Sequence, residues 1–300
     1  MYGTVQVDLD GLWTYCRYLG REVSPEKTDP VYTEGLVRFL ELFNKYNIKA
    51  TFFIVGKDAH NPVHRVLIEQ IAGQGHEIAN HTMTHPERFS CLSENEINKE
   101  ISLCSDVLQK ISGQEPAGFR APTFGVNEKV LSVLSDRGYT YDSSLVPSGI
   151  LPLIMDAAHS FWRKRIMSVR AGRLSFGLAP LDIYRPQKKV LWKRGQNRLV
   201  EVPVSVIPGL RLPMHSSYVF LFGLKYFEYG LKKMRKANVS MNYLFHGIDL
   251  VDLSTQDLRL PGAKPVKDRI ILCEQILKKL RLAFDLMTTK KLVTRSEKKI

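Results

Sequence analysis

The sequence has few cysteines and no long apolar run. Four cysteines occur among its 300 residues, and no two of them have the spacing of a zinc-binding or redox motif. We therefore expect reduced thiols and no disulfide framework. No segment reaches the roughly 18–20 apolar residues that a membrane-spanning helix needs. The first residues show neither the basic nor the apolar region of a signal peptide, so we expect a cytoplasmic protein.

Acidic residues are scarce in the second half of the chain. Residues 1–150 contain 14 Lys and Arg against 19 Asp and Glu, whereas residues 151–300 contain 29 against 11. This imbalance favours a basic surface for an anionic partner, such as a lipid-linked phosphate or an anionic membrane at its cytoplasmic face. A basic surface that is merely solvated is the alternative. The chain has no recognised nucleic-acid-binding module, so we expect no nucleic-acid partner.

Apolar segments of strand length alternate with segments of helical periodicity. This alternation is typical of parallel strands joined by crossover helices, and so of an α/β fold. Residues 150–198 are rich in Lys and Arg and lack a clean period, which predicts an insertion into a domain that spans residues 1–265. A C-terminal helix and a frayed basic tail, residues 287–300, are expected within 266–300. Strands are predicted at 4–10, 49–55, 76–80, from 118, and at 139–143, 199–207 and 239–245, with helices at 33–46, 62–74, 93–111, 127–137, 222–237 and 268–286.

Polar side chains fall at the predicted carboxyl ends of several strands. In parallel α/β barrels this rim holds the active site, so we place the candidate site there. Structural roles are the alternatives, such as an internal ion pair for Arg120, a core position for His246 and a turn or helix cap for Asp142. The polar residues at strand ends are Asp8, Asp10, His81, Arg120, Asp142 and His246.

Two of these strand ends carry the residues of a metal site. His81 and His85 are four residues apart, so both imidazoles can reach one centre. Asp8 and Asp10 are two apart and leave a strand on the same side. Two nitrogens and one carboxylate oxygen leave coordination positions open, and this ligand set suits a divalent cation, with zinc preferred.

Four short motifs occur in a fixed order along the chain. They are Asp8-Leu9-Asp10-Gly11, His81-Thr82-Met83-Thr84-His85, Arg120-Ala121-Pro122 and Leu244-Phe245-His246. In this order they resemble the motifs of the polysaccharide deacetylases of the NodB-homology type, carbohydrate esterase family four, in the branch whose first motif is Asp-x-Asp. The resemblance covers residues 4–146 and 199–252.

The resemblance implies a distorted (β/α) barrel with fewer than eight complete units. It implies Asp10, His81 and His85 as metal ligands. By the same similarity Asp8 is the catalytic base and His246 the general acid. Asp142 stands where the family often has a carboxylate that supports the acid, although the Trp that usually follows is absent.

The residue types suit hydrolysis of an amide. A bound zinc ion lowers the pKa of a water ligand toward about 7, and Asp8 can accept the proton of the attacking water. Arg120 is expected to pair with Asp8 and keep it ionised. A backbone N–H near Thr123 can stabilise the oxyanion. His246 can protonate the departing amine.

Three hypotheses follow for the function. The first is a metal-dependent hydrolase that removes an acetyl or formyl group from an N-acylated amino sugar, including a sugar carried on a lipid phosphate. The second keeps the metal site but acts on small cyclic amides or imides. The third is an inactive member of the family that binds carbohydrate or membrane.

Overall fold

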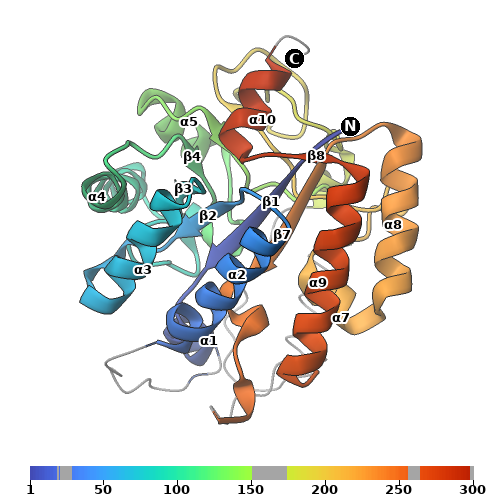
Figure 1. The fold of residues 1–300 in the computed structure, drawn as a ribbon. Helices are drawn as coiled ribbons and strands as arrows, with labels where there is room; N and C mark the ends of the chain where they lie inside the picture. Colours follow the sequence, from blue (N-terminus) through green and yellow to red (C-terminus); the bar gives the residue numbers. More distant parts are fainter. Residues whose placement is uncertain (19, 21–28, 151–173, 256–263, 298–300) are drawn as a thin grey trace.

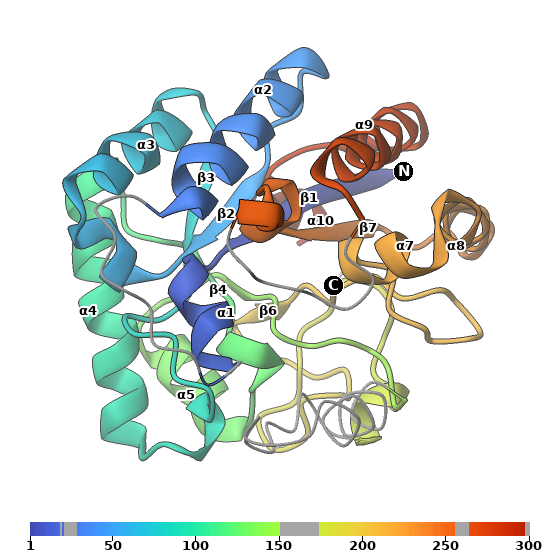
Figure 2. The same ribbon diagram turned by 90° about the horizontal axis from the view of Figure 1, so that it is seen from below.

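A parallel β-sheet forms the centre of the molecule. The computed structural model describes residues 1–18, 20, 29–150, 174–255 and 264–297. Its strands lie side by side in the order β6-β5-β4-β3-β2-β1-β7, and β8 pairs with the start of β1. The helices surround the strands on the outside (Figures 1 and 2). The strands are β1 (Tyr2–Leu9), β2 (Thr51–Ile54), β3 (Glu77–Asn80), β4 (Gly118–Phe119), β5 (Tyr141–Asp142), β6 (Val200–Glu201), β7 (Met241–His246) and β8 (Asp285–Leu286).

The predicted α/β fold and its distorted barrel are confirmed. Helical segments connect successive parallel strands from β1 to β5, as the alternating pattern predicts. The helices are α1 (Leu12–Tyr18), α2 (Val37–Lys45), α3 (Pro62–Gly73), α4 (Glu94–Ser112), α5 (Glu128–Asp136), α7 (Ser216–Phe222), α8 (Leu224–Ala237), α9 (Val266–Ala283) and α10 (Thr289–Ser296). The predicted start of α4 is also confirmed, since Ser93 and Glu96 form a capping box.

The barrel is irregular between β6 and β7. The strand predicted at 199–207 shortens to the two residues of β6, because Pro203 has no N–H to continue a ladder. The chain beyond Pro203 reaches β7 through a single backbone contact, in which the Ser205 N–H donates to the Asn242 carbonyl oxygen at 3.0 Å. This irregular stretch therefore leads from β6 to β7 without adding a complete β/α unit.

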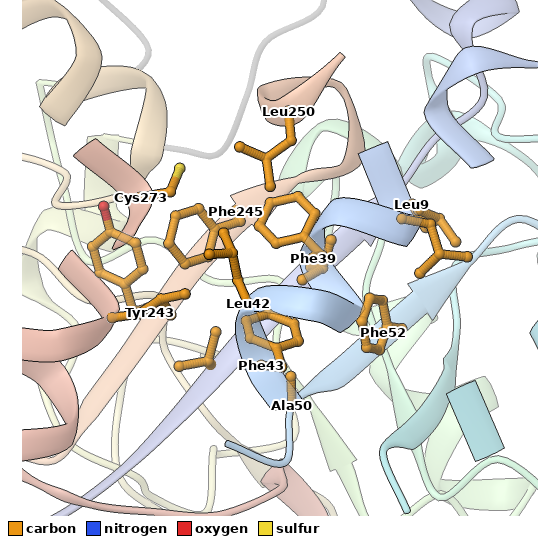
Figure 3. Packing of buried hydrophobic residues seen from close by; sticks show 14 of the residues in the cluster. Leu9, Phe39, Leu42, Phe43, Ala50, Phe52, Tyr243, Phe245, Leu250 and Cys273 are labelled. Atoms are coloured by element: carbon orange, nitrogen blue, oxygen red, sulfur yellow. The ribbon is translucent and has the colours of Figure 1, made fainter. Parts of the chain in front are cut away.

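The main core lies between the sheet and the helices α2 and α9. Phe39 of α2 packs on Phe245 of β7 with ring centroids 5.3 Å apart, and Phe43 packs on Phe52 of β2 at 5.9 Å. Figure 3 shows these rings meeting in one apolar layer. All residues of β1 after Tyr2 are buried, as expected for a central parallel strand covered on both faces.

The prediction of a frayed tail at 287–300 is wrong for residues 287–297. Thr289 begins α10 and is fully buried, as are Leu292 and Val293. The Thr289 hydroxyl lies 3.0 Å from the Thr4 hydroxyl and accepts a hydrogen bond from Gln6 Nε2 at 2.9 Å. The basic side chains of α10 hid this apolar face in the sequence pattern. Residues 298–300 lie outside the described residues.

Two other predicted helices also have different boundaries. The helix predicted at 222–237 is two helices, because Gly223 has a φ of 83° and separates α7 from α8. The helix predicted at 268–286 ends at Ala283, since Phe284 is extended and leads into β8. In the predicted insertion, residues 151–173 lie outside the described residues, and 174–198 contain mainly turns. Among the described helices, none combines the length and the apolar content needed to cross a membrane.

Candidate active site

Three predicted metal ligands come together at the carboxyl end of the sheet. Asp10 directly follows β1 and His81 directly follows β3. Asp10 Oδ1 lies 3.2 Å from His81 Nε2 and 3.6 Å from His85 Nε2. All three residues are buried, and their ligand atoms lie within 4.8 Å of one another. Asp10 Oδ1 has no hydrogen-bond donor among the described residues, which fits an oxygen that binds a cation.

The hydrogen bonds and charges around the histidines also fit a cation. His81 Nδ1 lies 2.8 Å from the Arg120 carbonyl oxygen, so Nδ1 donates and Nε2 keeps its lone pair toward Asp10. Burial lowers the pKa of His85 to about 4, which leaves its ring neutral near pH 7. Burial would raise the pKa of Asp10, but His85 and His81 outweigh it and hold the carboxyl ionised. Burial alone would lower the pKa of His81, but the Asp10 carboxylate outweighs this effect, so the pKa of His81 is raised. A bound cation would displace the proton that the raised pKa favours.

Asp8 forms the predicted ion pair with Arg120. Arg120 Nη1 donates to Asp8 Oδ1 at 2.6 Å, and the Arg120 side chain is completely buried. Its guanidinium lies over Phe53, 4.3 Å from the ring centroid. It also donates to the carbonyl and hydroxyl oxygens of Ser143, at 2.8 and 2.9 Å. Nη2 contacts the Gln6 amide oxygen, and the Gln6 amide nitrogen donates to Thr289. A polar column therefore runs through the barrel from α10 to Asp8.

His246 lies beside Asp8. The two residues are partners in the parallel pairing of β1 and β7, so their side chains leave adjacent strands on the same side. The Ser216 hydroxyl lies 3.4 Å from His246 Nδ1, and the His246 backbone N–H donates to Asp249 Oδ2 at 2.8 Å. The His215 ring is 5.7 Å from the His246 ring, centroid to centroid. His246 thus has an orienting hydroxyl and a nearby carboxylate.

Left-handed backbone conformations occur in the two loops that border the site. The φ angles are 67° at Thr82, 51° at His85, 52° at Thr123 and 57° at Phe124. Such conformations cost about 1–3 kcal/mol each in residues other than glycine, so the surrounding contacts must enforce them. The Thr123 hydroxyl donates to the Pro122 carbonyl oxygen at 2.7 Å. The role of the Thr123 backbone N–H toward an oxyanion stays a prediction.

Asp142 contacts the loop that follows Arg120. Its carboxylate accepts a hydrogen bond from the Ser144 hydroxyl at 2.5 Å, and that hydroxyl accepts one from the Ala121 N–H at 2.8 Å. Asp142 pairs in register with Glu201, and burial raises the pKa of Asp142 to about 6. None of these contacts involves His246, so the support of His246 by Asp142 stays a prediction.

Sequence reasoning missed several residues next to the candidate site. Ser216 and Asp249 adjoin His246, and the phenols of Tyr15 and Tyr18 come from α1. For Asp249 a signal exists, because it follows His246 at the three-residue spacing of a capping box. The tyrosines carry no such signal, since α1 is too short for its period to reveal which face turns toward the site.

Known proteins resemble both the sequence and the fold. Residues 28–141 match the family model described as polysaccharide deacetylase. A peptidoglycan-N-acetylglucosamine deacetylase of Bacillus cereus is 28% identical over 41% of this chain and 43% of its own length. A peptidoglycan deacetylase of Helicobacter pylori is 25% identical over 66% of this chain and 63% of its own length. The chain therefore spans less than two thirds of these relatives. A Mycobacterium smegmatis structure assigned as a polysaccharide deacetylase superposes with a TM-score of 0.65 at 20% identity, over 99% of this chain and 91% of that one.

Proposed function

We propose that this chain is a metal-dependent hydrolase of the polysaccharide deacetylase type, which removes an acetyl or formyl group from an N-acylated amino sugar; its residues 28–141 match the model of that family. The observation that carries the proposal is the buried cluster of Asp10, His81 and His85 beside the Asp8–Arg120 pair. We propose zinc as the metal, because imidazole and carboxylate ligands suit it.

Each side chain around the cluster has a role in the proposed reaction. A bound zinc ion supplies Lewis acidity and lowers the pKa of a water ligand. Asp8, held by Arg120, accepts the proton of the water that adds to the amide carbon. His246, oriented by Ser216, donates a proton to the amine nitrogen as the carbon–nitrogen bond breaks. The acyl group leaves as a carboxylate and the sugar as a free amine.

An Asp8→Asn variant tests this assignment. We expect it to retain one equivalent of zinc and to lose deacylation by at least about a hundredfold, the lower range for a missing general base. Zinc content is measured by elemental analysis, and released acetate or formate is measured with N-acyl sugars as substrates. The matched control is His60→Asn, since His60 lies outside the cluster, and it should retain both properties. Wild-type turnover by Asp8→Asn would refute the role of Asp8.

We further propose that the sugar is carried on a lipid phosphate, and that the protein meets it at the inner face of the cytoplasmic membrane. Residues 174–255 contain 12 Lys and Arg against 5 Asp and Glu. Apolar side chains with exposures of 55–76% accompany them, namely Leu174, Leu178, Leu210, Leu221 and Phe222. Figure 2 looks onto the carboxyl ends of the strands and shows α7 and the yellow-green turn at 174–178 on that side. Exposed apolar side chains among basic residues favour binding to an anionic membrane surface.

Sedimentation with lipid vesicles tests the membrane proposal. We expect binding to vesicles that contain anionic phosphatidylglycerol, and little binding to phosphatidylcholine alone. The double variant Leu221→Ser and Phe222→Ser should lose most of this binding. Leu282→Ser is the matched control, because Leu282 is 80% exposed but lies on α9 at its far end. Equal binding by the double variant and the control would reject this surface.

A further inference from the structure

The short helix α1 is fixed beside the metal-ligand loop. At its start, Asp58 accepts hydrogen bonds from the Gly11 N–H at 3.1 Å and from Trp13 Nε1 at 2.6 Å. At its end, Arg17 contacts the carbonyl oxygen of His85 and forms an ion pair with Glu87 at 3.1 Å. Figure 2 shows α1 in front of the carboxyl ends of the strands. The helix therefore forms one wall of the candidate active site.

This wall carries the phenols of two tyrosines. Tyr15 and Tyr18 are three residues apart and so share one face of α1. Their hydroxyl oxygens are buried and make no hydrogen bond within the described part of the chain. The Tyr18 ring meets His85 edge to face, with centroids 6.3 Å apart. An unmade hydrogen bond at a buried polar group costs about 1–3 kcal/mol, so these positions favour a ligand that supplies an acceptor.

Charge distinguishes Tyr15 from an ordinary buried tyrosine. Burial and then the carboxylates of Asp10, Asp249 and Asp8 raise the pKa of Tyr15, because all three lie near its phenol. Asp10 is a predicted metal ligand, Asp8 is the proposed base, and Asp249 accepts a hydrogen bond from the backbone N–H of His246, the proposed acid. Tyr243 provides a contrast, because its hydroxyl also lacks a hydrogen-bond partner among the described residues, but it lies in the apolar core beside Cys273 and, of these three carboxylates, only Asp249 raises its pKa (Figure 3).

We propose that Tyr15 is a further catalytic residue, which donates its phenolic hydrogen to the carbonyl oxygen of the acyl group. The proposal rests on the proposed function, because it takes the N-acyl sugar as the ligand. The phenol stays protonated and can only donate to the reacting centre. As water adds to the amide carbon, the carbonyl oxygen gains negative charge, and a hydrogen bond from Tyr15 strengthens at that point.

The kinetic test compares Tyr15→Phe with Tyr243→Phe in the zinc-loaded full chain. The substrate is a chitin tetramer, or the lipid-linked N-acyl sugar if the wild type prefers it. For Tyr15→Phe we expect kcat to fall at least tenfold, with KM changed less than about threefold and zinc content unchanged, because the hydrogen bond forms mainly in the transition state. Tyr243→Phe should remain within about twofold of the wild type. A kcat for Tyr15→Phe within twofold of the wild type would overturn the proposal.

A binding measurement separates this proposal from the function itself. Acetohydroxamate, a small metal-binding mimic of the acyl group, is titrated into both variants by calorimetry with zinc present. We expect Tyr15→Phe to bind it about tenfold more weakly than Tyr243→Phe does. If the wild type deacylates no sugar, the proposed function is wrong, but this titration still tests Tyr15. Equal affinities of the two variants for acetohydroxamate would reject the contact between Tyr15 and the acyl oxygen. Thermal unfolding verifies folding, and Tyr15→Phe should be at least as stable as the wild type, since the lost hydroxyl makes no hydrogen bond to any residue that the structure describes.

Discussion

Replacement of Arg120 by Met tests the buried ion pair that holds the proposed base. The change removes the only charge that contacts Asp8 within the described ion pairs, and it leaves the Asp8 carboxylate buried. Loss of one partner of a buried ion pair typically destabilises a protein by about 3–5 kcal/mol. The packing of the guanidinium on Phe53 is lost as well, although the Met side chain restores part of that contact. We therefore expect the free energy of unfolding to fall by about 3–5 kcal/mol.

Urea unfolding at pH 7, followed by circular dichroism, measures this loss. Arg65→Met is the control, because the Arg65 side chain is 53% exposed and forms a surface ion pair with Glu69 on α3; we expect a loss of at most about 1 kcal/mol there. Adding Asp8→Asn to Arg120→Met should recover at least about 1 kcal/mol relative to the sum of the single losses, since no charge is then stranded. A loss below about 1 kcal/mol for Arg120→Met, or strict additivity in the double variant, would refute the reasoning.

Three further predictions follow from other features. Burial raises the pKa of Asp58 from 3.8 to about 7, so the stability contributed by its protonated form is complete below about pH 4 and is lost as the pH rises through 7. In Asp58→Asn the free energy of unfolding, measured with urea, should therefore decrease less between pH 4 and pH 8 than in the wild type. The same decrease in the variant and the wild type would contradict this prediction. In Gly35→Ala the new Cβ would lie 2.2 Å from the Gly247 carbonyl oxygen, so we expect a loss of about 1–3 kcal/mol and lower activity, measured by thermal unfolding and turnover. Chelation of the metal should lower the unfolding temperature, and added zinc should restore it, since a metal at a hundred times its Kd stabilises the folded protein by about 2.7 kcal/mol. The unfolding temperature of Asp10→Ala should not change when zinc is added.

The strand-end residues could be predicted because their spacing reflects local backbone geometry. Asp10, His81 and His85 each follow a strand that periodicity identifies, and parallel strands bring such ends together. Arg120 could be paired with Asp8 for the same reason. The neighbours of His246 are harder to predict from the sequence, because Ser216 comes from α7 and its position depends on how that helix packs against β7.

Other features depend on long-range packing that a single sequence does not reveal. Asp142 lies at the end of β5 as predicted, but its contacts are set by Ser144 and by β6, which is only two residues long. The sequence pattern predicts a tail where α10 forms, because Lys290 and Lys291 dominate that stretch, whereas the buried contacts of Thr289 fix the position of the helix. Likewise, the orientation of α1 depends on Asp58, which is 47 residues from Gly11 along the chain.

The polar column inside the barrel has a consequence for the order of folding during synthesis. Gln6 contacts Arg120 on one side and Thr289 on the other, and Thr289 is 283 residues away along the chain. Contacts of such separation form late, because the intervening loop must first be closed. We expect the nascent protein to pair β1 with β2 and β3, and so to gather Asp10, His81 and His85, while it is still being translated. The anchoring of Arg120, and with it of the proposed base, is complete only after Thr289 has emerged from the ribosome.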